Sequence, residues 1–253
     1  MKHRFRVASA VGVSALIAAA FVIPATSASA SDYRPEGPSR VVFVQTDNTA
    51  GNQVVAYDRA SDGTLTLAAT YNTGGLGGQL VGSAVDHLAS QGSLAFDARH
   101  NSLIAVNAGS NTISLFKVDG NALHLRQVIS SGGTFPVSVT AYNNIVYVLN
   151  ARDGGSIQGY RYDDGRLELV RHWNRPLGLD STLTPEFTHS PGQVAFSPDG
   201  SQLLVTTKAN THSIDVFAIS DSGRQLCHLA ARSACKPLRI SGSSTCRPVG
   251  SRA

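Results

Sequence analysis

The sequence has few cysteines, and its body lacks the motifs that mark common catalytic and metal centres. Its 253 residues contain three cysteines, and all three come after Leu226. Between Arg40 and Arg224 there is no Gly-x-Ser-x-Gly, no His-Glu-x-x-His and no cysteine and histidine cluster of metal-ligand spacing. Their absence argues against an α/β-hydrolase, a zincin and a zinc-binding module. Glycines 74–78 also lack the spacing of a phosphate-binding loop. The sequence predicts no metal and no cofactor.

The body of the chain also lacks an excess of positive charge. The formal net charge is +4. However, three of the 21 Lys and Arg residues lie before residue 7, and six follow Gly223. All 17 Asp and Glu residues lie between Asp32 and Asp221, where 12 Lys and Arg residues remain. An acidic body of this kind does not provide the basic surface that nucleic acid requires, so no nucleic-acid partner is expected.

The only long apolar run, Val7–Ile23, follows a positively charged start and precedes Ala28-Ser29-Ala30. This pattern predicts a secretory signal peptide over residues 1–30, cut after Ala30. The alternative is a membrane anchor, but the run is shorter than the roughly 20 apolar residues of a span. We therefore expect a secreted, extracellular protein without a membrane segment after cleavage. Residues 31–39 are expected to be a short leader.

Turns of similar sequence divide the rest of the chain into units. They are Asp62-Gly63, Asp119-Gly120, Asp164-Gly165 and, less closely, Ser222-Gly223, whose glycines are 57, 45 and 58 residues apart. Asp-Gly between alternating apolar segments is typical of a β-hairpin, because glycine supplies the positive φ of the tight turn. Units of this length with about four strands each are typical of β-propeller blades. A β-sandwich with similar strand spacing is the alternative.

The units also share their internal order. Residues 92–116 and 191–217 both contain Ala-Phe, a polar turn, an apolar strand, a polar loop with Asn-Thr, and a strand ending in Phe. Residues 136–160 form a third copy, and residues 40–70 form three strands of a first unit. The sequence therefore predicts an all-β protein with a partial β-propeller over residues 40–225, equal to about 3.75 four-stranded blades. Aromatic residues that close the third strands are expected in the core: Tyr57, Phe116, Tyr160 and Phe217.

Residues 226–253 differ from the units in composition. They contain Cys227, Cys235 and Cys246 but no acidic or aromatic residue and no alternating pattern. The cysteine spacings match no zinc site, and an odd number leaves one thiol unpaired in an exported chain. One interpretation is a disulfide or metal module. The other, which the composition favours, is an anomalous tail produced by a frameshift or a damaged end.

Three segments resemble the lactonase family of seven-bladed propellers, which includes 6-phosphogluconolactonase-type and carboxymuconate-lactonising enzymes. They are residues 51–65, residues 194–204 with Ser-Pro-Asp-Gly, and Ser213-Ile-Asp-Val-Phe217. The resemblance covers residues 40–224 and implies seven blades, a bacterial exported member and a hydrolase. It also implies a Pro-His pair at the start of inner strands. The matching positions are Pro136-Val137 and Pro191-Gly192, where neither Val nor Gly can act as a base.

Other polar residues near these positions are candidates for a site. Glu186 and His189, in the loop before the fourth unit, are the candidate catalytic bases, and Arg152 is the candidate oxyanion-binding cation. The candidate ligand-binding residues follow second strands or lie in the glycine-rich connection: Asn107, Lys208, Asp86 and His87. For each of these residues the alternative is a solvated or structural loop side chain.

Two functional classes follow. The first is an exported hydrolase of a lactone or a related small molecule. The second is a non-catalytic extracellular propeller that binds a small molecule or a partner, with a non-functional truncated fragment as its extreme form. Because half a ring leaves blade faces and strand edges uncovered, we also expect self-association through these edges and poor stability of the isolated chain.

Overall fold

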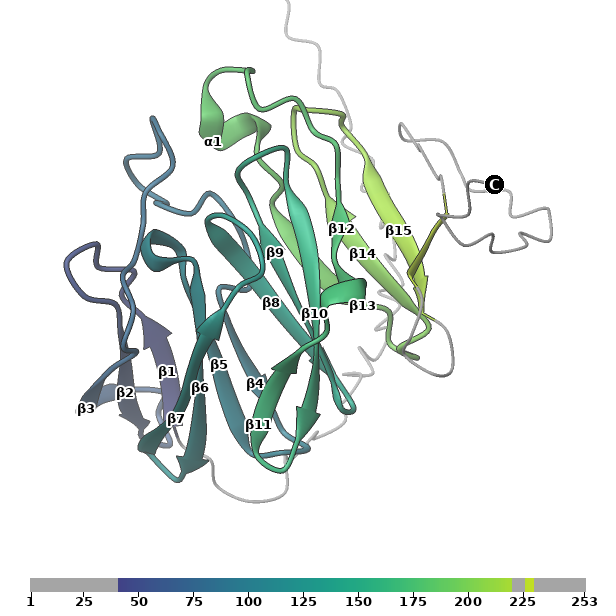
Figure 1. Cartoon of the computed structure of the whole chain (residues 1–253). Helices are drawn as coiled ribbons and strands as arrows, with labels where there is room; N and C mark the ends of the chain where they lie inside the picture. Colours follow the sequence, from purple (N-terminus) through teal and green to yellow (C-terminus); the bar gives the residue numbers. More distant parts are fainter. Residues whose placement is uncertain (1–40, 220–225, 230–253) are drawn as a thin grey trace, which may run out of the picture. The chain divides into compact units, whose positions relative to one another are not determined.

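The structure is a computed structural model, and it describes residues 41–219 and 226–229. These residues form successive antiparallel sheets in which each strand pairs with its neighbour in the chain (Figure 1). The first sheet contains three strands, β1 (Val41–Gln45), β2 (Gln53–Arg59) and β3 (Leu65–Asn72). The second contains four: β4 (Leu94–Asp97), β5 (Ser102–Asn107), β6 (Thr112–Asp119) and β7 (Ala122–Ser130).

The third and fourth sheets repeat this plan. The third consists of β8 (Pro136–Tyr142), β9 (Ile145–Asn150), β10 (Ser156–Asp163) and β11 (Arg166–Leu169), with the short β12 (Arg175–Pro176) also paired to β10. The fourth consists of β13 (Gln193–Phe196), β14 (Gln202–Thr206), β15 (Ile214–Ile219) and β16 (Leu226–Leu229). The described helices are short: η1 (Ala108–Ser110), η2 (Arg171–Trp173) and α1 (Glu186–His189). The prediction of an all-β, propeller-like fold is confirmed.

The repeated turns form for the reason that the sequence suggests. Gly120 and Gly165, which join the last two strands of the second and third sheets, have φ angles of +59° and +73°. Only glycine adopts this conformation readily, so the Asp-Gly pairs determine where these hairpins close. In the fourth sheet the outer strand β16 lies beyond residue 225, where we placed the end of the propeller region. The remainder of the predicted tail lies outside the described residues.

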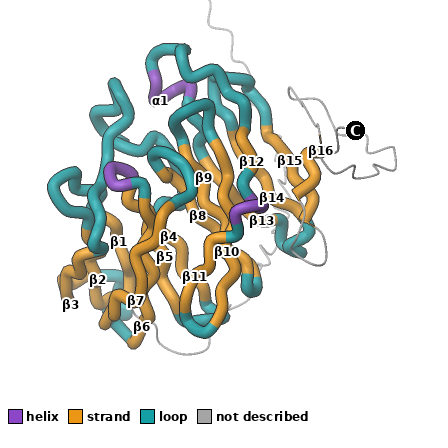
Figure 2. Tube along the Cα trace, viewed as in Figure 1, coloured by secondary structure: helices purple, strands orange, loops and turns teal. Residues whose placement is uncertain are grey.

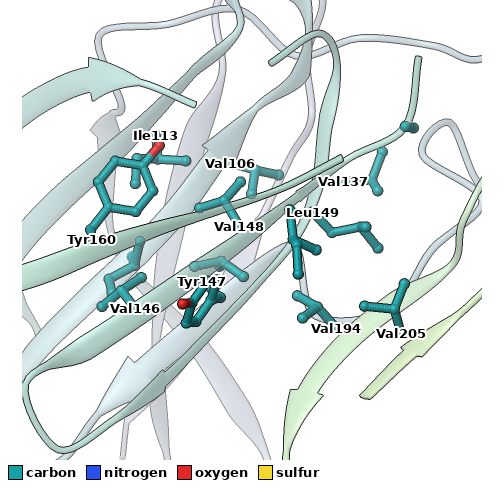
Figure 3. Packing of buried hydrophobic residues seen from close by; sticks show 14 of the residues in the cluster. Val106, Ile113, Val137, Val146, Tyr147, Val148, Leu149, Tyr160, Val194 and Val205 are labelled. Atoms are coloured by element: carbon teal, nitrogen blue, oxygen red, sulfur yellow. The ribbon is translucent and has the colours of Figure 1, made fainter. Parts of the chain in front are cut away.

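The core consists of aliphatic and aromatic side chains from facing sheets. One cluster joins the second, third and fourth sheets, and a smaller one joins the first and second. Figure 3 shows Leu149 of β9 close to Val194 and Val205 of the fourth sheet, and all three are buried. Three of the four expected core aromatics, Phe116, Tyr160 and Phe217, are buried. The fourth, Tyr57, is half-buried.

Candidate functional site

Buried asparagines end the second strands of the second and third sheets and hold the loops that follow. Asn107 donates from Nδ2 to Thr112 Oγ1 at 3.1 Å and to Ser114 Oγ at 2.8 Å. Asn150 ends β9 in the same way, and both side chains are fully buried. We predicted that Asn107 contacts a ligand, but the structure places its amide inside this hydrogen-bond network. These hydrogen bonds stabilise the loop after β5, and the ligand contact of Asn107 stays a prediction.

A long connection, residues 73–93, joins β3 to β4 and passes Asn107 at Gly75, and we call it the crossing loop. Figure 2 draws it among the teal loops. The Gly77 amide donates to Asn48 O beside the first sheet, and the Gly109 amide at the second sheet donates to Leu76 O. Further along, the Gln91 amide donates to Gly192 O at the start of β13. The glycines of this loop permit these close backbone contacts.

A cavity of about 820 Å³ lies between the crossing loop and the fourth sheet, and we call it the large cavity. Residues 82–91 form one wall, while α1, β13 and β14 with their adjoining loops form the other. Lys208 and Asp86, both predicted ligand contacts, are its charged lining residues. Much of the remaining lining is apolar: Ala84, Val85, Ala89, Phe187 and Ala209. Sequence reasoning missed Phe187, although its position two residues before His189 placed it in a candidate loop.

Lys208 connects the two walls of the large cavity. Its Nζ donates to the backbone oxygens of Ala89 and Phe187, at 2.8 and 2.5 Å, and to Ser190 Oγ at 3.0 Å. Burial lowers the pKa of Lys208 to about 8, and the negative charge of Asp86 opposes this shift. At neutral pH the ammonium group therefore persists, with its three hydrogens shared among protein oxygens.

The two positions that the lactonase resemblance assigns to histidine offer no catalytic group. Val137 is fully buried in the core. Gly192 lines the large cavity, and a Cβ atom there would lie 3.1 Å from Thr206 Oγ1 and 3.3 Å from Lys208 Cγ. The methylene chain of Lys208 thus lies beside the position where a larger side chain would begin.

The three predicted catalytic residues come together around a different, smaller cavity of about 290 Å³. The Arg152 guanidinium donates to both carboxylate oxygens of Glu186, from Nε at 2.7 Å and from Nη2 at 3.2 Å. The Val81 amide donates to Glu186 Oε2 at 2.6 Å. The Arg152 hydrogen bonds, followed by the smaller effect of the Val81 amide, lower the pKa of Glu186. Such a stabilised carboxylate is a weak base and serves to fasten the crossing loop to α1.

His189 completes this group at the end of α1. Its Nδ1 lies 2.9 Å from both Pro185 O and Thr188 Oγ1. These contacts orient the imidazole ring, while its backbone oxygen accepts a hydrogen bond from Asn210 Nδ2. The spacing in sequence indicated that Glu186 and His189 were neighbours. The sequence did not indicate that Arg152, 34 residues before Glu186, would form an ion pair with the Glu186 carboxylate.

His87, the remaining predicted ligand contact, lies beside a residue that we did not select. Its Nδ1 is 3.8 Å from Asp47 Oδ2, and the Asp47 side chain is only 15% exposed. Asp47 Oδ1 accepts a hydrogen bond from the Gly78 amide, whereas Oδ2 has no hydrogen-bond partner in the described structure. Burial raises the pKa of Asp47 to about 6. Its position directly after the strand that ends near Thr46 was the signal available in the sequence.

We expect Asp47→Asn to stabilise the protein at about pH 8, by about 1–3 kcal/mol in unfolding free energy. The pKa of Asp47 is higher in the folded protein, so with rising pH the carboxyl group loses its proton in the unfolded chain at a lower pH than in the folded protein. The buried charge therefore begins to destabilise the folded protein at about pH 4 and does so fully above about pH 6. The gain should therefore disappear below about pH 4. Urea unfolding of the parent protein and of Asp47→Asn between about pH 4 and about pH 8 measures this difference in unfolding free energy. A variant that is less stable at pH 8 would contradict the assignment of a buried, unfavourable charge.

The four sheets, together with the two cavities beside the crossing loop and α1, define an all-β, propeller-like protein with a candidate small-molecule site. In the described part of the chain, no three His, Cys, Asp or Glu side chains lie where they could hold a metal ion. No helix among the described residues has the length and hydrophobicity needed to cross a membrane.

Comparison with known proteins gave structural similarities alone. No family model matches the chain, and no curated protein does. Among solved structures, it is similar to a candidate 6-phosphogluconolactonase from Bacteroides uniformis, with 15% identity and a TM-score of 0.45, covering 75% of this chain and 67% of that one. A candidate 6-phosphogluconolactonase from Bacteroides fragilis has 15% identity and a TM-score of 0.44, with coverage of 76% and 67%.

Proposed function

We propose that the protein is an exported binding protein that holds a small, uncharged organic molecule, such as a lactone, in the large cavity. The observation that carries this proposal is the cavity itself. Its volume of about 820 Å³ lies within the range of small-molecule sites, which are usually apolar with a few convergent polar groups. Phe187 and the nearby alanines supply the apolar surface, and Lys208 and Asp86 supply the polar groups.

The charges of the large cavity favour an uncharged ligand. Lys208 and Asp86 carry opposite charges, so the lining has no excess of either sign. The Lys208 hydrogens already bind three protein oxygens. A carboxylate ligand would compete with these oxygens and would lose its hydration against the apolar wall, at a substantial energetic penalty. An ester or lactone carbonyl has a smaller desolvation penalty.

Hydrolysis of the bound lactone is the second candidate function, and the lowered pKa of Lys208 favours it. A lysine with a pKa near 8 can act as a general base at mildly alkaline pH. If it does so, the hydrolysis rate should rise with pH up to about 8 and then level off, because the neutral amine is the active form. The Glu186 carboxylate is a poorer candidate, since Arg152 holds it ionised and hydrogen-bonded.

The binding proposal predicts that Lys208→Met and Phe187→Ala both weaken the binding of δ-valerolactone. Loss of the Lys208 hydrogen bonds separates the two walls, and loss of the Phe187 ring removes apolar contact. We expect each change to raise the Kd by about tenfold. Calorimetric titration measures the Kd, and lactone consumption in the same samples reports hydrolysis. Arg171→Ala, on an exposed residue away from the cavity, is the control. Equal affinities of the parent protein and all three variants would exclude the large cavity as the lactone-binding site.

Export is part of the same proposal, and it is supported by the pattern of residues 1–30, which lie outside the described structure. Expression of the full chain in a secreting bacterial host should release a protein whose N-terminal sequence begins at Ser31. A cell-associated product that retains Met1 would contradict export with cleavage after Ala30.

A further inference from the structure

A third cavity, of about 550 Å³, lies at the opposite end of the strands, and we call it the basic cavity. It is bordered by the start of β5, the end of β6, β7 and the turn between β10 and β11. Lys117, Arg126 and Arg166 line it together with His100, whereas Asp164 is its only lining carboxylate. None of the ion pairs found among the described residues includes any of these three cations. The cavity therefore has an excess of positive charge.

A β-bulge places Arg126 at this cavity. On the pair of strands β6 and β7, Leu115 lies opposite Gln127 and Phe116 lies opposite Leu125, which leaves Arg126 as the extra residue. Bulges of this kind redirect a side chain and often lie next to functional sites. The first sheet has the same irregularity, with Tyr57 opposite Leu67 and Ala56 opposite Ala69. Its extra residue is Ala68, so the first and second sheets share the bulge while the arginine is particular to the second.

Arg166 is held next to Arg126 by a pair of hydrogen bonds between the two sheets. Gln127 donates from Nε2 to Leu167 O at 3.0 Å, and the Leu167 amide donates to Gln127 Oε1 at 2.8 Å. Because Arg126 precedes Gln127 and Arg166 precedes Leu167, this contact fixes the distance between the backbones that carry the two arginines. Both arginines line the same cavity from backbones that are held together, and two guanidinium groups that converge there are suited to bind one oxyanion.

His100 forms another ordered part of the cavity wall. The Asp97 carboxylate, which is nearly buried, accepts a hydrogen bond from His100 Nδ1 at 2.6 Å. The imidazole ring stacks on Tyr162 with 3.9 Å between the ring centroids, and Tyr162 OH lies 2.9 Å from Ser102 Oγ. Lys117 Nζ donates to the His100 backbone oxygen at 3.1 Å. These contacts hold this wall of the cavity in place.

We infer that the basic cavity is a binding site for a tetrahedral oxyanion with two negative charges, such as phosphate or sulfate. Arg126 and Arg166 supply the paired donors, and Lys117 supplies a further donor. The cavity is larger than a free anion requires, so it also accommodates a small molecule that carries a phosphate group. This site is separate from the large cavity and does not depend on the function proposed for it.

The test uses calorimetric titration of the full-length protein with inorganic phosphate, inorganic sulfate and phenyl phosphate, at constant ionic strength maintained with chloride. We expect saturable binding of an oxyanion, and a Kd at least about tenfold higher in Arg126→Ala and in Arg166→Ala. Arg126→Ala gives the second-sheet bulge the residue that occupies the first-sheet bulge, so it should fold normally. Arg171→Ala removes the same charge elsewhere and should leave the Kd unchanged.

The three ligands separate the sources of the oxyanion. Tighter binding of phenyl phosphate than of inorganic phosphate would assign the site to a phosphorylated molecule, and equal affinities would assign it to the free anion. The proposal is overturned if none of the three ligands binds at concentrations up to about 10 mM. It is also overturned if Arg171→Ala weakens binding as much as Arg126→Ala, because binding would then reflect net charge alone.

Discussion

Replacing Gly77 by alanine is expected to lower the unfolding free energy by about 3 kcal/mol and to disrupt the large cavity. An alanine Cβ at this position would lie 2.2 Å from both the carbonyl carbon and the carbonyl oxygen of Asp47. These are backbone atoms, which cannot move aside as the end of a flexible side chain can. The crossing loop would have to leave the first sheet and lose the hydrogen bond from the Gly77 amide to Asn48 O.

Gly51→Ala is the matched control for this substitution. Gly51 lies in the neighbouring loop of the first sheet, and a Cβ there would meet nothing within 4 Å. Its effect on stability should stay within about 0.5 kcal/mol, as for most surface changes. Urea unfolding followed by circular dichroism compares the two variants. If Gly77→Ala unfolds at the same urea concentration as Gly51→Ala, the crossing loop does not approach the first sheet as described.

Tyr147→Ala is expected to destabilise the protein by about 3–5 kcal/mol, as is typical when a large buried aromatic ring is removed. Tyr147 is 1% exposed and belongs to β9. Its ring centroid lies 6.2 Å from that of Trp173 in η2, which follows β11 of the third sheet, and 6.0 Å from that of Phe196 in β13. The ring therefore fills space between the third and fourth sheets, and alanine would leave a cavity between them.

Tyr147→Phe separates packing from any effect of the hydroxyl group. It keeps the ring that contacts Trp173 and Phe196, so we expect a change of less than about 1 kcal/mol. Thermal unfolding of the two variants and the parent protein measures both effects. Equal stability of Tyr147→Ala and Tyr147→Phe would show that the third and fourth sheets are not packed through this side chain.

The fold could be predicted because its signals are local. Alternation of apolar residues and the Asp-Gly turns depend on neighbours within a few positions. The third copy expected over residues 136–160 begins with β8 and continues through β9. The sequence did not reveal β16, because Leu226–Leu229 lies in a segment without the alternating pattern.

The candidate site was predictable only in part, because its geometry depends on contacts between distant segments. The Lys208 ammonium group binds Ala89 O across 119 residues, and composition gives no indication of such a contact. Asn107 shows that the direction of a polar side chain is also hard to predict from sequence. A polar residue at the end of a strand can face a ligand or the protein interior, and the partners Thr112 and Ser114 decide the outcome here.

Three further expectations from the sequence stay predictions. Self-association through uncovered edges is consistent with the exposure of Leu65 and Leu67 on β3, which pairs with β2 alone among the described strands. Gel filtration would test it, together with the expectation of poor stability in isolation. The origin of residues 226–253 is a question for resequencing of the gene across this segment.

The most direct test of the large cavity as a binding site is two-dimensional ¹H–¹⁵N NMR of the labelled protein during titration with δ-valerolactone. We predict saturable shifts of the backbone amide signals of cavity residues, among them Phe187, Gly192 and Lys208. Signals of residues at the basic cavity, such as Tyr162, should not move. Shifts that are absent, that fail to saturate, or that gather away from the crossing loop and the fourth sheet would contradict the proposed binding site.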